Sequence, residues 1–155
     1  MSVSLYGSGQ TVIQVQSFTT NTTFSTTSAT PVATPVTVSI TPQSTTSKIL
    51  VIGTIGEVGS NGSSAMITIN RSGTNLALGT GGTYNITAVT TVNASGGNGY
   101  NSVVSYLDSP STTSSLTYTL YLATEGGLTA TLNKRQSDNT FNTSSTITVL
   151  EISGS

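Results

Sequence analysis

The chain of 155 residues contains no histidine, no cysteine and no tryptophan. Without imidazole and thiol groups it lacks the usual ligands of zinc, the nucleophile of thiol enzymes and the base of Ser-His-Asp triads. A disulfide framework is also impossible. The sequence therefore predicts no catalytic residues, no cofactor-binding residues and no metal ligands.

Charge is nearly as scarce, with four Lys and Arg against five Asp and Glu. Nucleic acids and anionic membranes are bound through clusters of Lys and Arg, so we expect neither as a partner. The segment Met1–Gly7 has neither the basic nor the apolar part of a secretory signal, so none is predicted. The longest apolar stretch, Ile49–Ile55, is far too short to cross a bilayer.

What the chain has in abundance is small polar side chains: 25 Ser, 32 Thr and 11 Asn, together with 16 Gly. Hydrophobic residues make up only 34% of the chain, but disordered chains of low hydrophobicity usually carry high charge as well. Thr, Val and Ile favour β-strands, and the length suits one domain. We therefore expect a single all-β domain.

Period-two alternation recurs along the chain, whereas helical spacing is absent. Gln10–Phe18 and Pro35–Ile40 both alternate, and in the second segment the even-numbered apolar residues are predicted to face inward. The uninterrupted apolar run Ile49–Ile52 is typical of a strand that is covered on both faces. It is the strongest candidate for the core.

A tight hairpin is predicted where Met66–Asn70 alternates, Arg71–Thr74 turns, and Leu76 and Leu78 lie on the return strand. Glycine at position 73 fits this turn. The remaining predicted strands are Thr83–Val92, Ser102–Leu107, Leu116–Ala123, Leu128–Leu132 and Ser145–Ile152. About nine or ten short strands separated by Gly, Pro, Asn and Ser clusters indicate a β-sandwich or barrel.

Two segments interrupt this rhythm. Phe18–Thr34 is a charge-free Ser/Thr stretch containing Phe24, and Ala94–Asn101 is rich in Gly and Asn. The first could be disordered, or it could be an arm that orders against a neighbouring subunit; the apolar strand before it favours the arm. We therefore divide the chain into an N-terminal strand and arm, residues 1–34, and a β-sandwich, residues 35–155.

Few side chains are candidates for chemistry. A glycosidase needs two carboxyl groups about 5–9.5 Å apart, and nothing in the spacing of Asp108 and Glu125 brings them together. We interpret them as a turn cap and a loop residue. Glu151 alternates in phase with inward residues, and because a buried charge needs a partner, Arg71 or Lys48 are the candidates.

The remaining distinctive residues favour structural roles. Lys134 and Arg135 are interpreted as part of a solvated turn. Gly56–Gly62 and Gly79–Gly82 lack the Gly-Lys-Ser/Thr ending of a phosphate loop and are interpreted as hairpin turns. Tyr84 and Tyr100 border Gly/Asn-rich loops, where packing is favoured over stacking on a sugar ring.

Several segments occur in a recognisable succession. They are Gly9–Ser17 leading into Phe24–Ser28, then Ser39–Ile52, Ile69–Leu76, Tyr106–Tyr118 and Ser145–Ile152. In this order they resemble small structural proteins of tailed bacteriophages, of the head-decoration or fibre type. The resemblance covers nearly the whole chain.

The resemblance implies a non-enzymatic virion protein with a jelly-roll-like antiparallel β-sandwich, on the outer surface of the particle. Its expected partners are further copies of itself, as a homotrimer, and the major capsid protein or another virion protein. Because the chain begins at Met1 without an anchoring domain, we expect a capsid cement protein. The expected interface residues are Tyr6, Val12, Val15, Phe18 and Phe24.

The alternative that the resemblance leaves open is a fibre or tailspike module that recognises host-surface glycans. In that case the contacts are expected at Tyr84 and Tyr100 and in the segment Ala94–Tyr100. No cofactor is expected under either interpretation.

Overall fold

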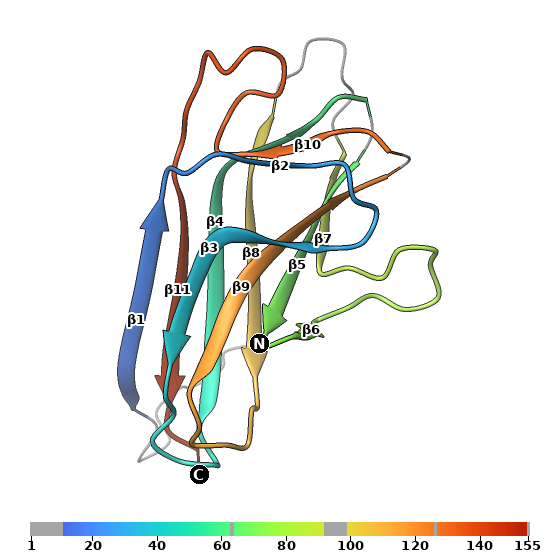
Figure 1. Ribbon diagram of the computed structural model, residues 1–155. Helices are drawn as coiled ribbons and strands as arrows, with labels where there is room; N and C mark the ends of the chain where they lie inside the picture. Colours follow the sequence, from blue (N-terminus) through green and yellow to red (C-terminus); the bar gives the residue numbers. More distant parts are fainter. Residues whose placement is uncertain (1–10, 63, 92–98, 126, 155) are drawn as a thin grey trace, which may run out of the picture.

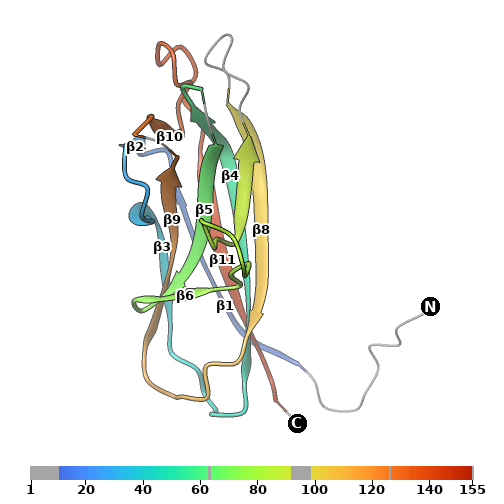
Figure 2. The same ribbon diagram turned by 90° about the vertical axis from the view of Figure 1, so that its right-hand side faces the viewer.

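The computed structural model describes residues 11–62, 64–91, 99–125 and 127–154, which form eleven strands and no helix (Figure 1). The strands in chain order are β1 (Val12–Thr20), β2 (Phe24–Thr26), β3 (Val32–Ile40), β4 (Lys48–Ser60), β5 (Ser64–Arg71), β6 (Thr74–Leu76), β7 (Ala88–Thr91), β8 (Tyr100–Asp108), β9 (Leu116–Thr124), β10 (Ala130–Leu132) and β11 (Ser145–Ile152). They pack as two layers, visible from the side in Figure 2.

Both sheets are antiparallel throughout. The six-stranded sheet has the order β1-β11-β4-β10-β2, with β8 pairing along β4 as well, and the five-stranded sheet has the order β3-β9-β5-β6, with β7 pairing along β5. The eight longer strands form two groups of four, β1-β11-β4-β8 in one sheet and β3-β9-β5-β7 in the other. Along these eight strands the chain passes from one sheet to the other at every connection except the one from β5 to β7. This is the arrangement of a jelly roll, so the predicted fold class is confirmed.

The core lies between the two layers, where alternate residues of each strand turn inward. On β3 the inward residues are Val36, Val38 and Ile40, as the alternation predicted. The largest fully buried side chains include Ile49, Ile55, Ile67, Ile69, Tyr118, Leu120, Leu122 and Ile147. Gly53 of β4 lies beneath Leu120, and a Cβ there would come within 2.9 Å of Leu120 Cδ1. A larger residue would therefore overpack the core.

The predicted hairpin is confirmed between β5 and β6. Ser72 and Gly73 occupy its two turn positions with φ of 46° and 94°, as the tightest hairpin turns require. The return strand is shorter than expected, because β6 ends at Leu76 and Ala77 adopts φ of 52°. Leu78 therefore lies beyond the strand.

Residues 18–34, predicted to form an arm, run along the sandwich of this same chain. β2 pairs with β10, and the Thr124 amide donates a 2.8 Å hydrogen bond to the Ser28 carbonyl. The expected boundary at residue 34 falls inside β3. Residues 1–10 lie outside the described part of the chain, and contact of this segment with a neighbouring subunit stays a prediction.

The run Ile49–Ile52 is covered on one face only. Ile49 and Val51 are fully buried between the sheets, whereas Leu50 and Ile52 are half-buried on the outer face of β4. The prediction of a strand covered on both faces is therefore wrong for the single chain, because a two-layer sandwich leaves the outside of each sheet open.

Candidate functional site

Asp108, at the end of β8, is the centre of a buried polar cluster between the two sheets. Arg71 Nη1 donates to Asp108 Oδ1 at 2.8 Å and to Oδ2 at 2.7 Å, and the Tyr118 hydroxyl donates to Oδ2 at 2.7 Å. The Ser109 amide donates to Oδ1 at 2.9 Å, which agrees with the expected turn cap. The carboxylate, only 4% exposed, has its hydrogen-bonding capacity occupied by structural partners.

Tyr118 is kept neutral by its surroundings. Burial raises the pKa of its hydroxyl well above the ordinary value, and the hydrogen bond to Asp108 and the negative charge of that carboxylate raise it further. The positive charge of Arg71 opposes these effects only in part. Tyr118 therefore serves as a permanent hydrogen-bond donor at ordinary pH.

Glu151 is fully buried on the inward face of β11, but the expected cation does not pair with it. Its carboxylate accepts 2.6 Å and 2.7 Å hydrogen bonds from Gln14 Nε2 and from the Gln43 amide. Burial raises the pKa of Glu151, but the donors around it lower that pKa by more, so it lies below the ordinary value. The expected pairing with Arg71 or Lys48 is wrong, because neutral donors satisfy the charge instead.

Asp108 and Glu125, the two carboxyl groups weighed for glycan cleavage, lie far apart. Asp108 is bound to Tyr118 near the start of β9, whereas Glu125 follows the end of that strand. At about 3.3 Å per residue, the seven residues from Tyr118 to Glu125 span roughly 20 Å, beyond the separation that a glycosidase uses. Among the described residues, no group of three acidic side chains could hold a metal ion.

The basic doublet lies in the loop between β10 and β11. Arg135 pairs with Asp138 and covers the ring of Phe141, with 4.7 Å from its guanidinium carbon to the ring centroid. Gly56 and Gly59 belong to β4, so the turn expected at Gly56–Gly62 is shorter than predicted. Gly79–Gly82 lies in the connection between β6 and β7.

The two candidate glycan contacts are exposed. Tyr84 lies in the connection that projects beside β6 (Figure 1), and Tyr100 begins β8 opposite Val58. Their exposed fractions are 39% and 53%. Residues 94–98 of the expected contact segment lie outside the described residues.

The candidate interface residues of the N-terminal segment have different surroundings. Val12, Val15 and Phe18 of β1 are exposed, whereas Phe24 of β2 packs against the hydrophobic core. Tyr6 lies outside the described residues. Of this set, Val15 belongs to a larger apolar surface. The other residues of that surface come from distant parts of the sequence, so the sequence around Val15 does not indicate it.

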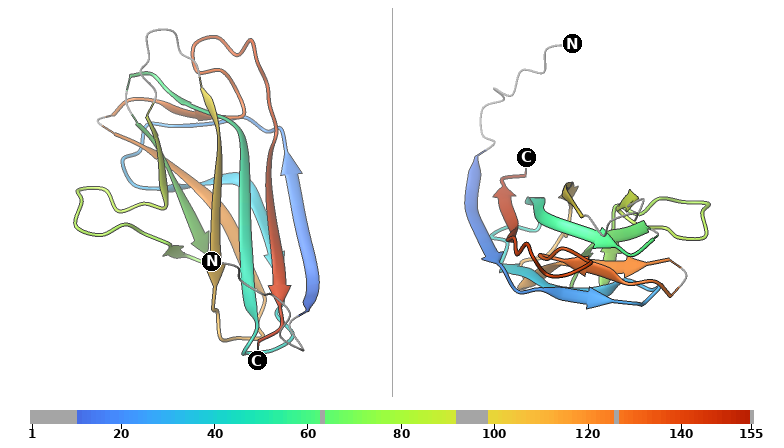
Figure 3. Two further views of the ribbon diagram at one scale, coloured as in Figure 1. Left: turned by 180° about the vertical axis from the view of Figure 1, so that it is seen from behind. Right: turned by 90° about the horizontal axis from the view of Figure 1, so that it is seen from above.

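That surface is the outer face of the quartet β1-β11-β4-β8, seen from the front in the left view of Figure 3. Strand register aligns Val15, Leu150, Leu50 and Leu107 in one row across the four strands. With Ile52, Val103 and Ile152 of neighbouring rows, these seven residues form what we call the outer apolar face. Val103 and Leu107 are the most open, with 64% and 52% of their surface exposed.

Hydroxyl groups beside the outer apolar face hydrogen-bond to one another. Ser17 Oγ lies 2.8 Å from Thr148 Oγ1, and Thr19 Oγ1 lies 2.8 Å from Thr146 Oγ1. Because these groups already have protein partners, covering this face leaves fewer polar groups unsatisfied. Among the outward side chains of the paired parts of β1, β11, β4 and β8, Lys48 is the one charged residue, and it lies at one end of the face.

The outer face of the five-stranded sheet has a different character. Thr37 and Thr119 share a 2.8 Å hydroxyl contact there, and Ser39 and Thr117 share one of 2.9 Å. The residues that alternate with them, such as Val36 and Val38, are buried. Hydroxyl pairs therefore lie outside both sheets, and the five-stranded sheet also exposes Val89, but among the described residues only the six-stranded sheet carries a row of four apolar residues on its outer face.

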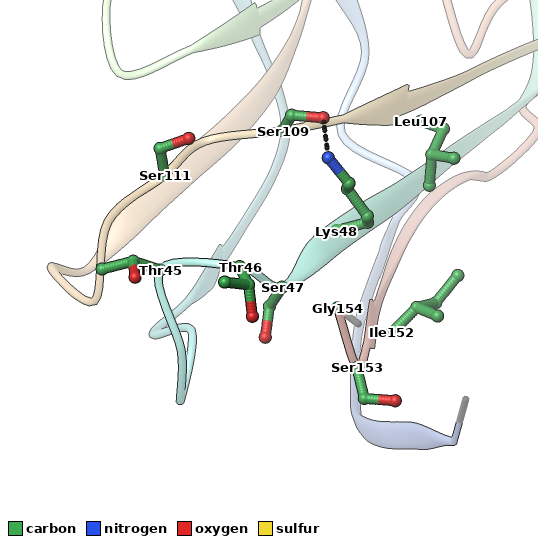
Figure 4. Close-up of a pocket in the computed structure, with 10 residues that line it drawn as sticks. All are labelled: Thr45, Thr46, Ser47, Lys48, Leu107, Ser109, Ser111, Ile152, Ser153 and Gly154. Carbon is green, nitrogen blue, oxygen red and sulfur yellow. Dashed lines mark hydrogen bonds between the residues drawn. The ribbon is translucent and has the colours of Figure 1, made fainter. Parts of the chain in front are cut away.

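A hollow of about 700 Å³ lies at the end of the outer apolar face (Figure 4). Its lining residues are Thr45, Thr46, Ser47, Lys48, Leu107, Ser109, Ser111, Ile152, Ser153 and Gly154. Leu107 and Ile152 belong to the outer apolar face, and Lys48 Nζ donates to Ser109 Oγ at 2.8 Å. No carboxylate side chain of the described residues lines this hollow, so these residues extend the apolar face with hydroxyl groups and one cation.

No family model and no curated protein matches the chain. Among solved structures, a chain of infectious bursal disease virus, Gx strain, aligns with 98% of this chain at 12% identity and a TM-score of 0.35. The aligned chain spans 44% of that viral chain. A likeness this low carries no argument about function. Within the described ranges, no helix is long and apolar enough to cross a membrane.

Proposed function

We propose that this chain is a non-enzymatic structural protein of a virus particle, which acts by docking to other proteins. The outer apolar face is the observation that carries the proposal. It presents leucine and valine side chains across four strands, with one lysine at its end. The largest apolar patch on a soluble protein is often a site of interaction with another protein.

The chemistry of the buried carboxylates supports a structural role. Asp108 and Glu151 are each held by several hydrogen-bond donors, so their charges stabilise the fold. Among the described residues, the side chains that line the hollow beside Lys48 include hydroxyl groups but no Asp, Glu or His that could act as a general base. These features support docking over catalysis.

The resemblance to bacteriophage proteins refines the proposal. The chain is a decoration or cement protein on the head of a tailed bacteriophage, where homotrimers bind the capsid surface and stabilise it. A surface made of Ser, Thr and Asn has few charges to desolvate when subunits pack, which suits many weak contacts across a shell.

The alternative is a fibre or tailspike module that binds host-surface glycans. It is favoured by the exposure of Tyr84 and Tyr100, whose rings could stack on a sugar. If it holds, Tyr84→Ala and Tyr100→Ala abolish binding to host cells, whereas Phe141→Ala, at another exposed aromatic residue, leaves binding intact.

The stoichiometry of purified particles separates the two proposals. A cement protein is present in many copies per head on a stained gel, and the purified protein binds empty heads in a pull-down. A fibre module is present in few copies and binds cells. Absence of the chain from purified particles would contradict both proposals.

A further inference from the structure

We infer that the outer apolar face is covered by another copy of this same chain. This rests on the proposed function only in that both treat the chain as a docking protein. The face lies on the outside of β1, β11, β4 and β8, away from the core, so nothing in the described part of this chain covers it. The occupant must present an apolar and nearly uncharged surface.

The charge pattern favours a copy of the chain as that occupant. The outward side chains of the paired parts of β1, β11, β4 and β8 include a single charged one, Lys48. Its ammonium group donates a hydrogen bond to Ser109 Oγ at the end of the face. Two such faces can meet with their lysine ends apart, so no like charges oppose each other. A partner rich in acidic or basic residues would instead have to bury charges against leucine and valine, which is costly.

The hydroxyl rows fit the same arrangement. Ser17 with Thr148, and Thr19 with Thr146, satisfy each other across β1 and β11. They can therefore enter an interface without partners on the other subunit. Packed sheets lie about 10 Å apart with side chains of both inner faces interdigitating, and a second outer apolar face supplies the required side chains.

The size of the outer face of these four strands agrees with the central part of an interface. Four strands about 4.8 Å apart and seven residues long at about 3.3 Å each give a footprint of roughly 440 Å², which the seven apolar residues share with outward Ser and Thr side chains. A standard interface covers about 800 Å² per partner, of which a polar rim forms the remainder. Hydroxyl groups around the hollow, such as those of Ser109 and Ser153, can supply this rim.

Sedimentation equilibrium of the full chain and two matched variants tests this inference. Leu107→Lys places a charge on the outer apolar face, and Ser39→Lys places the same charge on the outer face of the other sheet. Both positions are exposed on strands at a sheet edge, where lysine is tolerated. Denaturant midpoints verify that both variants fold.

Because two copies of one face pair about a two-fold axis, we expect the unsubstituted chain to form an even-numbered oligomer, either a dimer or, if separate contacts join trimers as in the proposed function, a hexamer. Leu107→Lys should raise its dissociation constant by about tenfold or more, while Ser39→Lys leaves it unchanged. The inference is overturned if the chain remains monomeric at every accessible concentration, or if both variants associate equally well. If the chain is monomeric in solution and the Leu107→Lys variant no longer binds to particles, a shell protein is the occupant of the face. This outcome contradicts the inference but supports the proposed function. If the chain forms an oligomer in solution but is absent from purified particles, the inference is supported and the proposed function is contradicted.

Discussion

Tyr118 on β9 and Asp108 on β8 join the two sheets of the jelly roll through a 2.7 Å hydrogen bond in the buried interior. Arg71 of β5 donates to the same carboxylate, so one acidic residue of the six-stranded sheet is held by two donors of the five-stranded sheet. This cluster fixes the position of the sheets near the end where the hollow lies.

Arg71→Met should destabilise the fold by about 3–5 kcal/mol, because it leaves the Asp108 carboxylate buried without its cation. Arg135→Met is the matched control, since the Arg135–Asp138 pair lies in an exposed loop, where solvent screening leaves such pairs little effect on stability. Urea unfolding measures both changes. Equal losses in the two variants would contradict a structural role for the buried cluster.

Alkaline titration should find one tyrosine that resists ionisation until the chain unfolds. The folded pKa of Tyr118 is raised, so its stabilising effect is complete below the unfolded pKa of about 10 and is lost as pH rises above it. The free energy of unfolding should therefore fall more steeply above that pH in the unsubstituted chain than in Tyr118→Phe. Absorbance of the phenolate counts the ionised tyrosines, and ionisation of one more tyrosine in the folded unsubstituted chain than in folded Tyr118→Phe would refute the assignment.

Acid should remove the contribution of Glu151. Its folded pKa is lowered, so the stabilisation is present above the unfolded pKa of about 4.3 and disappears as pH falls through the folded pKa. The difference in unfolding free energy between the unsubstituted chain and Glu151→Gln should be largest near neutral pH and shrink in acid. Gln14→Leu, which removes a donor, should reduce that difference, whereas Gln16→Leu on the same strand should not. A difference that does not change with pH would contradict this account.

Asn133 should prove important for the loop that connects β10 and β11. Fully buried at φ of 60°, it donates from Nδ2 to the carbonyls of Thr20 and Thr22 and accepts from Ser145. Asn133→Ala should cost about 2–4 kcal/mol, since it leaves buried groups without partners and strains the backbone.

Asn133→Gly separates the two contributions, because glycine adopts positive φ without strain. It should recover about 1 kcal/mol relative to Asn133→Ala in denaturant unfolding. If both variants unfold like the unsubstituted chain, the hydrogen bonds of Asn133 contribute nothing to stability.

The sequence was sufficient for features that depend on neighbouring residues. Alternation placed Val36, Val38 and Ile40 in the core, and the combination of Ser72 and Gly73 located the tightest hairpin. Both follow from local geometry, the two-residue period of a strand and the freedom of glycine at positive φ.

Features that depend on distant residues were not predictable in this way. Arg71 and Asp108 are separated by 37 positions, and only the register of the sheets brings them together. The same limitation led to the wrong partner for Glu151. The outer apolar face was missed because its seven residues come from four strands, although the run Ile49–Ile52 already indicated a strand that needs cover on both sides.

The most direct test of docking uses the absence of native cysteine. Single variants Val103→Cys, on the outer apolar face, and Ser39→Cys, on the opposite face, are labelled with a maleimide in the assembled state and after unfolding in urea. The account predicts that the thiol at position 103 reacts at least about tenfold more slowly in the assembly than in urea, while the thiol at position 39 reacts at nearly the same rate in both, because an interface excludes reagent and solvent from its centre. Equally fast labelling at both positions would contradict the claim that this face exists to dock against protein.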